Sequence, residues 1–225
     1  MKQAVALLRD ERGNLTIFVL TIFFFMVLVV FTVLFNISAI FACKEAAANS
    51  AEQASLAATG ILYDEVENAI HAYDLSIERL IDPVFIWPLV EEAMSSLQAA
   101  HPDWAASEVR FAAIDQVLLA ALPVTPQLEV YIWAGLDRAS QKVPGVVSGI
   151  LASNKSTLQG SSIKMFDGED RIEVKTSVRY ESQRFGLAFM PEHAEPIYQT
   201  GKSRPIGFVK ATSWGQQPSV TLGSN

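Results

Sequence analysis

The feature that most constrains this chain is a run of 29 residues, 15–43, without a single charged side chain. Of these residues 24 are apolar, and the other five are Thr, Asn or Ser. A helix of this length rises about 43 Å, whereas about 20 residues are enough to cross the hydrocarbon core of a bilayer. The run therefore predicts a transmembrane helix. Because all 41 charged residues lie outside it, the chain is neither a polytopic membrane protein nor an intrinsically disordered one.

Two other interpretations of the run remain open. A cleaved secretory signal has an apolar core of only about 7–15 residues, although the three alanines at 46–48 resemble a small-residue cleavage site. A lipoprotein anchor at Cys43 has suitable residues in Ile40 and Ala42, but the bulky Phe41 stands where a small residue is usual. The length of the run favours a helix that is retained in the membrane.

The charges that flank the run predict its orientation. Lys2, Arg9 and Arg12 precede it, and within about 20 residues after it there is one cation, Lys44. By the positive-inside rule, residues 1–14 form a cytoplasmic leader, residues 15–43 cross the cell membrane once, and the body lies outside the cytoplasm.

The rest of the composition excludes several classes of function. After Cys43 there are 14 basic and 22 acidic residues, and such an acidic body is a poor partner for nucleic acid. The chain contains one cysteine and three dispersed histidines, His71, His101 and His193, and has no phosphate-binding, nucleophile or metal-binding motif. We therefore expect no catalytic residues, no bound metal and no cofactor.

A second helical segment continues directly from the run. Residues 44–59 are strong helix formers without Pro or Gly, so one helix is expected from about residue 14 to residue 60. Small residues recur along it at spacings of three and four, and they would share one side. Either this stripe is a close-packing face against a helix of the same chain or of another subunit, or alanine serves there only as a helix former. The predicted interface consists of Ile40, Cys43, Ala47, Ala51, Ala54 and Ala58.

The N-terminal sequence resembles a known family. Arg-Asp-Glu-Arg-Gly-Asn at residues 9–14, followed by the long apolar helix and the Ala-rich segment, is similar to TadE/TadG-like proteins. These are pseudopilin-like accessory proteins of the tight-adherence (Flp, type IVb-like) pilus assembly system. The resemblance covers about the first 60 residues, and the last third fits more loosely through an alternating strand and Arg-Pro-Ile-Gly-Phe at residues 204–208. It implies a structural role and, as partners, other pilus-assembly or pseudopilin-like membrane subunits.

The resemblance also indicates a position for leader processing, at Gly13 and Asn14. Type IV pilin-like precursors are usually cut after such a Gly and carry Glu at the fifth position of the mature chain. Phe18 occupies that position here. This departure argues against both cleavage and incorporation into a filament core, whereas Gly13-Asn14 fits the membrane-anchored TadG-like branch.

The body is predicted to be α+β, with a small antiparallel sheet at the C-terminus. The extended helix reaches about residue 82, and a helical region covers residues 83–151 with helices expected over 87–100, 103–122 and 128–141. In the β-rich region, residues 152–225, a loop is expected over 152–169. The clearest strand covers 171–180, and shorter strands are expected over 185–190 and 206–212. In the strand over 171–180 the even-numbered side chains should be buried.

These observations together predict a single-pass, membrane-anchored structural or accessory component of a Tad/Flp-like pilus assembly or secretion system. It would act through helix–helix contacts and display an α+β domain. The alternative is a membrane-tethered extracytoplasmic module that binds a ligand or acts as a sensor, although a leader of about 14 residues offers little to carry a signal inward. An anchored hydrolase is a further rival, weakened by the lack of a catalytic motif.

Overall fold

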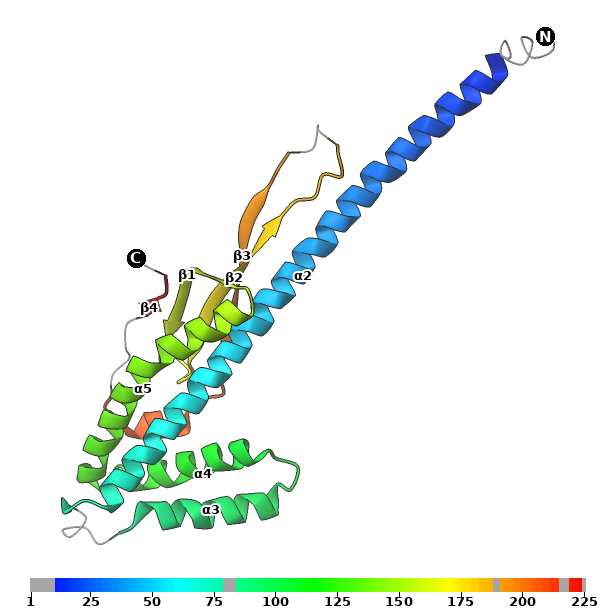
Figure 1. The fold of residues 1–225 in the computed structure, drawn as a ribbon. Helices are drawn as coiled ribbons and strands as arrows, with labels where there is room; N and C mark the ends of the chain where they lie inside the picture. Colours follow the sequence, from blue (N-terminus) through cyan, green and yellow to red (C-terminus); the bar gives the residue numbers. More distant parts are fainter. Residues whose placement is uncertain (1–10, 79–83, 188–190, 215–218, 224–225) are drawn as a thin grey trace. The chain divides into compact units, whose positions relative to one another are not determined.

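The fold is α+β, as predicted, in a computed structural model that describes residues 11–78, 84–187, 191–214 and 219–223 (Figure 1). By their contacts, the residues fall into two compact units. The first unit consists of Met1–Cys43 and Arg179–Glu195, and the second of Lys44–Val178 and Pro196–Asn225. Each unit is described separately below.

Helix α2 covers Glu11–Asp74 without interruption, so the continuous N-terminal helix is confirmed, but it ends at Asp74 and not near residue 82 as expected. Its polar residues in the apolar run bond back to the helix, as Thr21 and Thr32 donate from Oγ1 to the carbonyls of Ile17 and Leu28, both at 2.8 Å. These bonds satisfy the donors of both hydroxyls within the helix itself.

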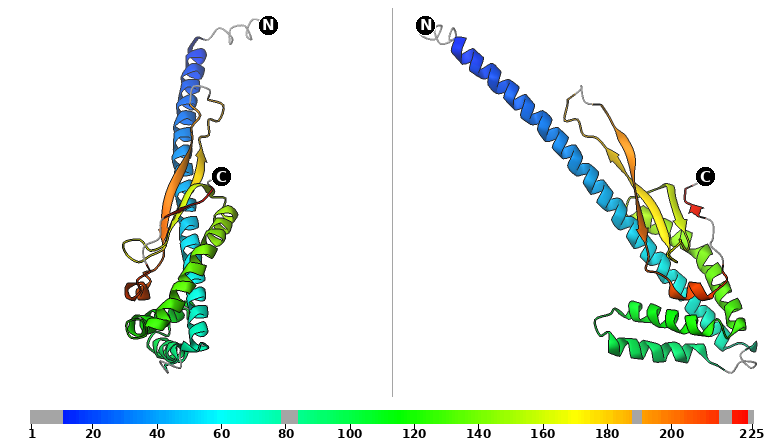
Figure 2. Two further views of the ribbon diagram at one scale, coloured as in Figure 1. Left: turned by 90° about the vertical axis from the view of Figure 1, so that its left-hand side faces the viewer. Right: turned by 180° about the vertical axis from the view of Figure 1, so that it is seen from behind.

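Three further helices belong to the second unit: α3 (Ile86–Ala100), α4 (Ala106–Ala121) and α5 (Pro126–Ser153). Figure 2 shows α3 and α4 side by side, and α5 alongside the second half of α2. The Asp74 carboxylate ends α2 and accepts hydrogen bonds from the backbone N–H groups of Ile86 and Trp87, at 2.9 and 2.8 Å. A carboxylate at this place satisfies amides that the first turn of α3 leaves unpaired.

The sheet has four strands in the order β3-β2-β1-β4. They are β1 (Thr157–Lys164), β2 (Glu173–Glu181), β3 (Ala194–Lys202) and β4 (Val220–Thr221). β1 pairs antiparallel with both β2 and β4, and its register with β2 shifts between Thr157 and Ser162. The expected burial of Val174, Thr176 and Tyr180 in β2, and of Ile172 just before it, is confirmed. Val178 is only half-buried, and Ser177 on the opposite face is fully buried.

Several expected boundaries in the body are wrong. The segment 152–169, expected as a loop, contains β1, whose residues are mostly small and polar and lack an apolar alternation. The strand expected over 206–212 is instead a 3₁₀ helix, η2 (Gly207–Ala211). Its Phe208 and Val209 are both buried, so an apolar run that resembles a strand is here one turn packed into the core.

Two further differences concern helix α5 and the C-terminal hairpin, the name used here for Arg179–Glu195, which includes the end of β2 and the start of β3. Of the strand expected over 185–190, Phe185 and Gly186 form a turn, and 188–190 lie outside the described residues. β3 occupies Ala194–Lys202, where a connecting segment was expected. Helix α5, expected to end near residue 141, continues through Pro144 to Ser153 because Val143, Val147 and Leu151 prolong its buried stripe.

Candidate functional site

The first half of the apolar helix is exposed on all sides. Every residue from 15 to 27 is exposed, and the large apolar side chains among them keep 46–68% of their surface accessible. In the part of the chain that the structure describes, α2 is the one helix long and apolar enough to cross a membrane. An apolar surface of this extent fits lipid or the apolar faces of other membrane helices.

The residues predicted for leader processing lie at the start of this helix. Gly13 and Asn14 are both in the first turn of α2. Phe18, which stands where pilins carry Glu, is 62% exposed. The exposed surface of α2 therefore has no carboxylate at position 18.

The predicted small-residue stripe is divided between the two units. In the first unit, Ile40 is 39% exposed and Cys43 is partly exposed. In the second unit, the four alanines of the stripe are completely buried against their own chain: Ala47, Ala51, Ala54 and Ala58. Of the two kinds of neighbour considered for this face, a segment of the same chain is the one that the structure places there.

Strand β3 approaches the alanine stripe closely at Gly201. A Cβ added at Gly201 would lie 2.3–2.5 Å from backbone atoms of Ala51 and Glu52, so the strand rests on the helix backbone itself. The same stretch of α2 is fixed to the segment just after α5 by a hydrogen bond that the Ser156 hydroxyl donates to the Ser50 hydroxyl, at 2.8 Å. Alanine in α2 and glycine in β3 permit this contact because neither presents bulk.

Asn36 is a polar residue of the apolar run in the first unit, and its own helix and the hairpin together satisfy its side chain. Its Nδ2 donates to the Thr32 carbonyl at 3.0 Å and to the Gln183 carbonyl at 2.9 Å. Its Oδ1 accepts from the Gln183 amide at 2.8 Å and from the Tyr180 hydroxyl at 3.0 Å. An amide offers two donors and two acceptor positions, so all four are used. Sequence reasoning missed this site, although a lone Asn in a charge-free apolar run signals that a partner is needed.

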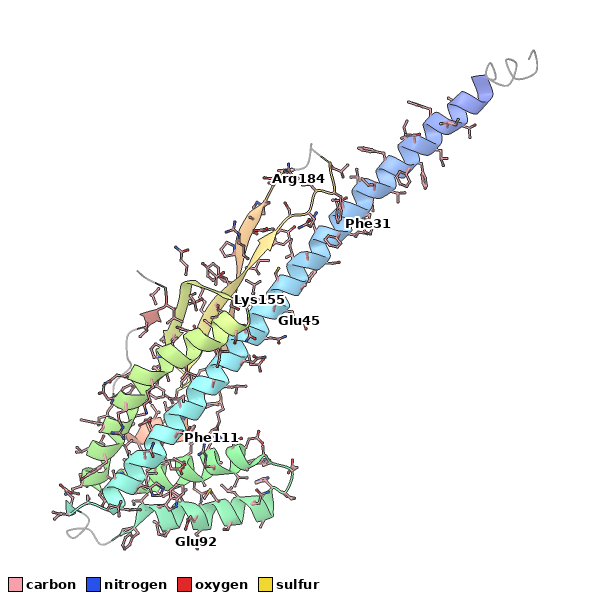
Figure 3. The ribbon with its side chains drawn as sticks, in the orientation of Figure 1. Phe31, Glu45, Glu92, Phe111, Lys155 and Arg184 are labelled. Atoms are coloured by element: carbon pink, nitrogen blue, oxygen red, sulfur yellow. The ribbon has the colours of Figure 1, made fainter. Side chains whose placement is uncertain are left out.

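Aromatic rings extend this contact towards the start of α2. The Phe185 ring lies 5.1 Å from the Phe35 ring and 6.1 Å from the Phe31 ring, measured between centroids. Figure 3 shows Phe31 on α2 near the end of the hairpin that carries Arg184. Phe185 has a φ of 46°, an unusual conformation for a bulky residue, and Gly186 follows at 81°. The turn thus presents an aromatic ring to the helix in a conformation that costs backbone energy.

A buried carboxylate organises the second unit. Asp115 on α4 accepts hydrogen bonds from the Tyr63 hydroxyl at 2.8 Å and from the Arg204 guanidinium at 3.1 Å. The backbone N–H of Phe208 also points to it, at 3.4 Å. The Arg-Pro-Ile-Gly-Phe segment, which carried the looser part of the family resemblance, thus meets α4 through both of its ends.

Burial and charge change the titration of this pair. Burial and the adjacent Asp115 charge raise the pKa of the Tyr63 phenol, so this hydroxyl stays protonated and donates. Burial also raises the pKa of Asp115, while the hydrogen bond from Tyr63 and the Arg204 charge act against that rise. The arrangement links α2, α4 and the C-terminal segment.

A second carboxylate joins α5 to α2. Glu65, which is buried, pairs with Arg138 at 2.9 Å and with Lys142. Hydrogen bonds from Lys142 and Arg138 hold the pKa of Glu65 below its usual value. The helices approach closely here, since a Cβ added at Gly135 would lie 2.8 Å from the Glu65 carbonyl oxygen.

A groove of about 630 Å³ lies between α3 and α4. Its lining is mostly aliphatic, with a few polar side chains at the edges. The aliphatic part includes Ile86, Leu89, Ala93, Val117, Ala120 and Val124, and the polar part includes Glu92, Ser96 and Gln116.

The histidines have separate environments. His71 lies against the Trp87 ring at 4.4 Å, His101 stacks on Trp104 at 4.1 Å, and His193 pairs with Glu195 at 3.1 Å. Within the described residues no three His, Cys, Asp or Glu side chains gather as a metal site requires.

Residues 13–60 match the family model described as Putative Flp pilus-assembly TadE/G-like. The N-terminal segment is TadE/G-like. The resemblance seen in the sequence is therefore confirmed over this segment. No curated protein and no solved structure matches the chain.

The TadE/G-like segment contains the features of α2 described above. It begins at Gly13, includes the exposed residues 15–27 and the Asn36 site, and ends just beyond Ala58. The match and the apolar helix together support an accessory role in pilus assembly and a single pass through a membrane.

Proposed function

We propose that the chain is a membrane-anchored accessory subunit of a Tad/Flp-type pilus assembly or secretion system, with its N-terminus in the cytoplasm and its body outside. The observation that carries this proposal is the coincidence of the TadE/G-like match with a helix surface that its own chain leaves exposed, residues 15–27. An anchor alone needs only apolar character. A surface for other membrane subunits needs a particular shape, because helices in lipid associate through packing.

In this proposal the alanine stripe is covered by other segments of the body and does not face a partner subunit. Ala51 and its neighbours on the stripe are buried under β3 and the segment just after α5, so contacts with partner subunits fall to the membrane part of α2. The body then serves as the displayed part of the subunit.

The test replaces residues 15–27 with a Leu/Ala sequence of equal length and apolar character, in cells from which the gene has been deleted. Deletion should abolish assembled pili, and the unaltered chain should restore them. The replaced chain should insert into the membrane, as shown by resistance to alkaline extraction, but should fail to restore pili because the packing surface is lost. Full restoration by the replaced chain would reduce α2 to a tether and overturn the proposal.

A ligand-binding role is the second candidate, and the groove between α3 and α4 favours it. Its volume lies in the range of small-molecule sites, and its apolar lining with a few polar groups is typical of them. Ala120→Phe would fill the groove. Pilus assembly that survives this change supports the first role, whereas loss of assembly with an unchanged melting temperature supports the second.

A further inference from the structure

Within the first unit, the hairpin runs along α2 towards the start of the apolar run. The Cys43 thiol lies 3.9 Å from the carbonyl oxygen of Arg179, and the Gln183 amide meets Asn36. From Cys43 to Asn36 the helix advances about 10 Å, and the extended chain from Arg179 to Gln183 covers about 13 Å. The two segments therefore run side by side over similar lengths. Phe185 extends this contact along α2 to Phe31 and Phe35.

The position of the bilayer along α2 follows from its charges. The last charged residue before the apolar run is Arg12, which belongs with the headgroups on that side. About 20 residues from Leu15 cross the hydrocarbon core and bring the helix to about residue 34. Asn36 then lies just beyond the hydrocarbon, and the rings of Phe31 and Phe35 lie at its edge.

The side chains of the hairpin turn suit the boundary between the hydrocarbon core and the headgroups. Phe185 is 51% exposed beside the two helix rings, and the Asn36 amide has no unsatisfied donor or acceptor to disfavour a nearby apolar phase. Charged residues belong to the same hairpin: Arg184 in the turn pairs with Glu192, and Glu195 contacts the His193 ring. An exposed aromatic ring among charged residues is typical of segments that lie in a membrane interface.

We propose that the turn at residues 183–187 is a lipid-binding element, in which Phe185 enters the interface of the leaflet next to the body. The partner is the bilayer surface itself. Tyr180 and Asn36 then stand at headgroup depth, where a Tyr side chain is favoured. The proposal depends on insertion of α2 but not on a role in pili, so the two can fail separately.

The experiment measures the depth of the turn in the full chain, reconstituted in vesicles of equal parts phosphatidylethanolamine and phosphatidylglycerol. Phe185→Trp keeps an aromatic ring at the tip. Glu181→Trp is the matched control on the same hairpin, at a residue whose side chain is 65% exposed. Lipids brominated on the acyl chains should quench the added emission of Phe185→Trp about twofold more than that of Glu181→Trp, after subtraction of the four native tryptophans.

A second measurement does not depend on tryptophan at this position. In a Cys43→Ala background, nitroxide labels are placed on Phe185→Cys, Glu181→Cys and the exposed membrane position Phe24→Cys. The label at 185 should resemble the label at 24, favouring collisions with oxygen over those with a water-soluble nickel chelate. Equal quenching of the two tryptophans overturns the proposal. A label at 185 that the chelate reaches as readily as that at 181, or that neither reagent reaches, also overturns it, the last result indicating a protein partner.

Discussion

Asp115 shows how one side chain can couple three parts of a fold. It lies on an otherwise apolar face of α4, where a lone carboxylate would be costly, and it is compensated by Tyr63 from α2 and Arg204 from the C-terminal segment. Removal of the carboxylate leaves both partners without their acceptor. The effect should therefore be much larger than for an exposed aspartate.

We expect Asp115→Ala to lower the free energy of unfolding by about 3 kcal/mol. The matched control is Asp137→Ala on α5, which removes an exposed carboxylate bonded to Gln141 and should cost about 0.5 kcal/mol or less. Urea unfolding of the full chain in detergent, followed by circular dichroism, compares the two. Similar losses in both variants would show that the buried cluster adds nothing.

We expect the ion pairs of Glu65 to make the stability of the fold depend on pH in the acidic range. Its folded pKa is lowered by Lys142 and Arg138, so the stabilisation is complete above the unfolded pKa of about 4.3 and is lost as pH falls through the folded value. Glu65→Gln should cost about 1 kcal/mol at pH 7, and this difference from the unaltered chain should shrink below about pH 4. Melting temperatures measured from pH 7 to pH 3 test this, with the exposed Glu92→Gln as control. Parallel curves for the unaltered chain and Glu65→Gln would contradict it.

At the scale of elements, the contact between β3 and α2 depends on the lack of a side chain. Gly201→Ala would place a methyl group against the backbone at Ala51, so β3 must move away, at a cost of about 1–3 kcal/mol. Gly149→Ala is the control, because a Cβ there meets nothing within 4 Å and the site is inside α5. This control should gain about 0.5–1 kcal/mol. If both variants unfold at the same denaturant concentration, the close approach is not a constraint.

The elements that could be predicted are those whose apolar residues repeat with one period. α2, α3 and α4 follow helical spacing, and β2 alternates between buried and exposed positions over most of its length. β3 is at the edge of the sheet, and most of its residues are exposed, so it has no apolar alternation to detect. The 3₁₀ turn at Phe208 is fixed by the contact with Asp115, which lies 93 residues away in the sequence.

The candidate sites also fall into those that could be predicted from the sequence and those that could not. The exposed surface of α2 and the small-residue stripe follow from spacing along one helix, and they could be read from the sequence. What covers the stripe could not, because Gly201 reaches Ala51 only through the pairing of strands distant in the chain. The Asn36 site depends likewise on Gln183, 147 residues away.

At the scale of the whole molecule, the proposed orientation can be tested by labelling. In a Cys43→Ala background, Glu92→Cys on the exposed face of α3 should react with a membrane-impermeant maleimide on intact cells or protoplasts. Gln3→Cys in the leader should react only after permeabilisation. The reverse pattern would place the body in the cytoplasm and contradict the proposed topology.

The distances in sequence between paired residues have a consequence for biosynthesis. Synthesis begins at the N-terminus, so α2 reaches the bilayer long before Gln183 and Tyr180 exist to bond Asn36. Until then, of its four hydrogen bonds, the amide has only the one to the Thr32 carbonyl of its own helix. In the proposed topology, Asn36 thus acquires its final polar partners only when about four fifths of the chain has been exported. A chain whose export stalls before Tyr180 therefore lacks the three hydrogen bonds between Asn36 and the hairpin.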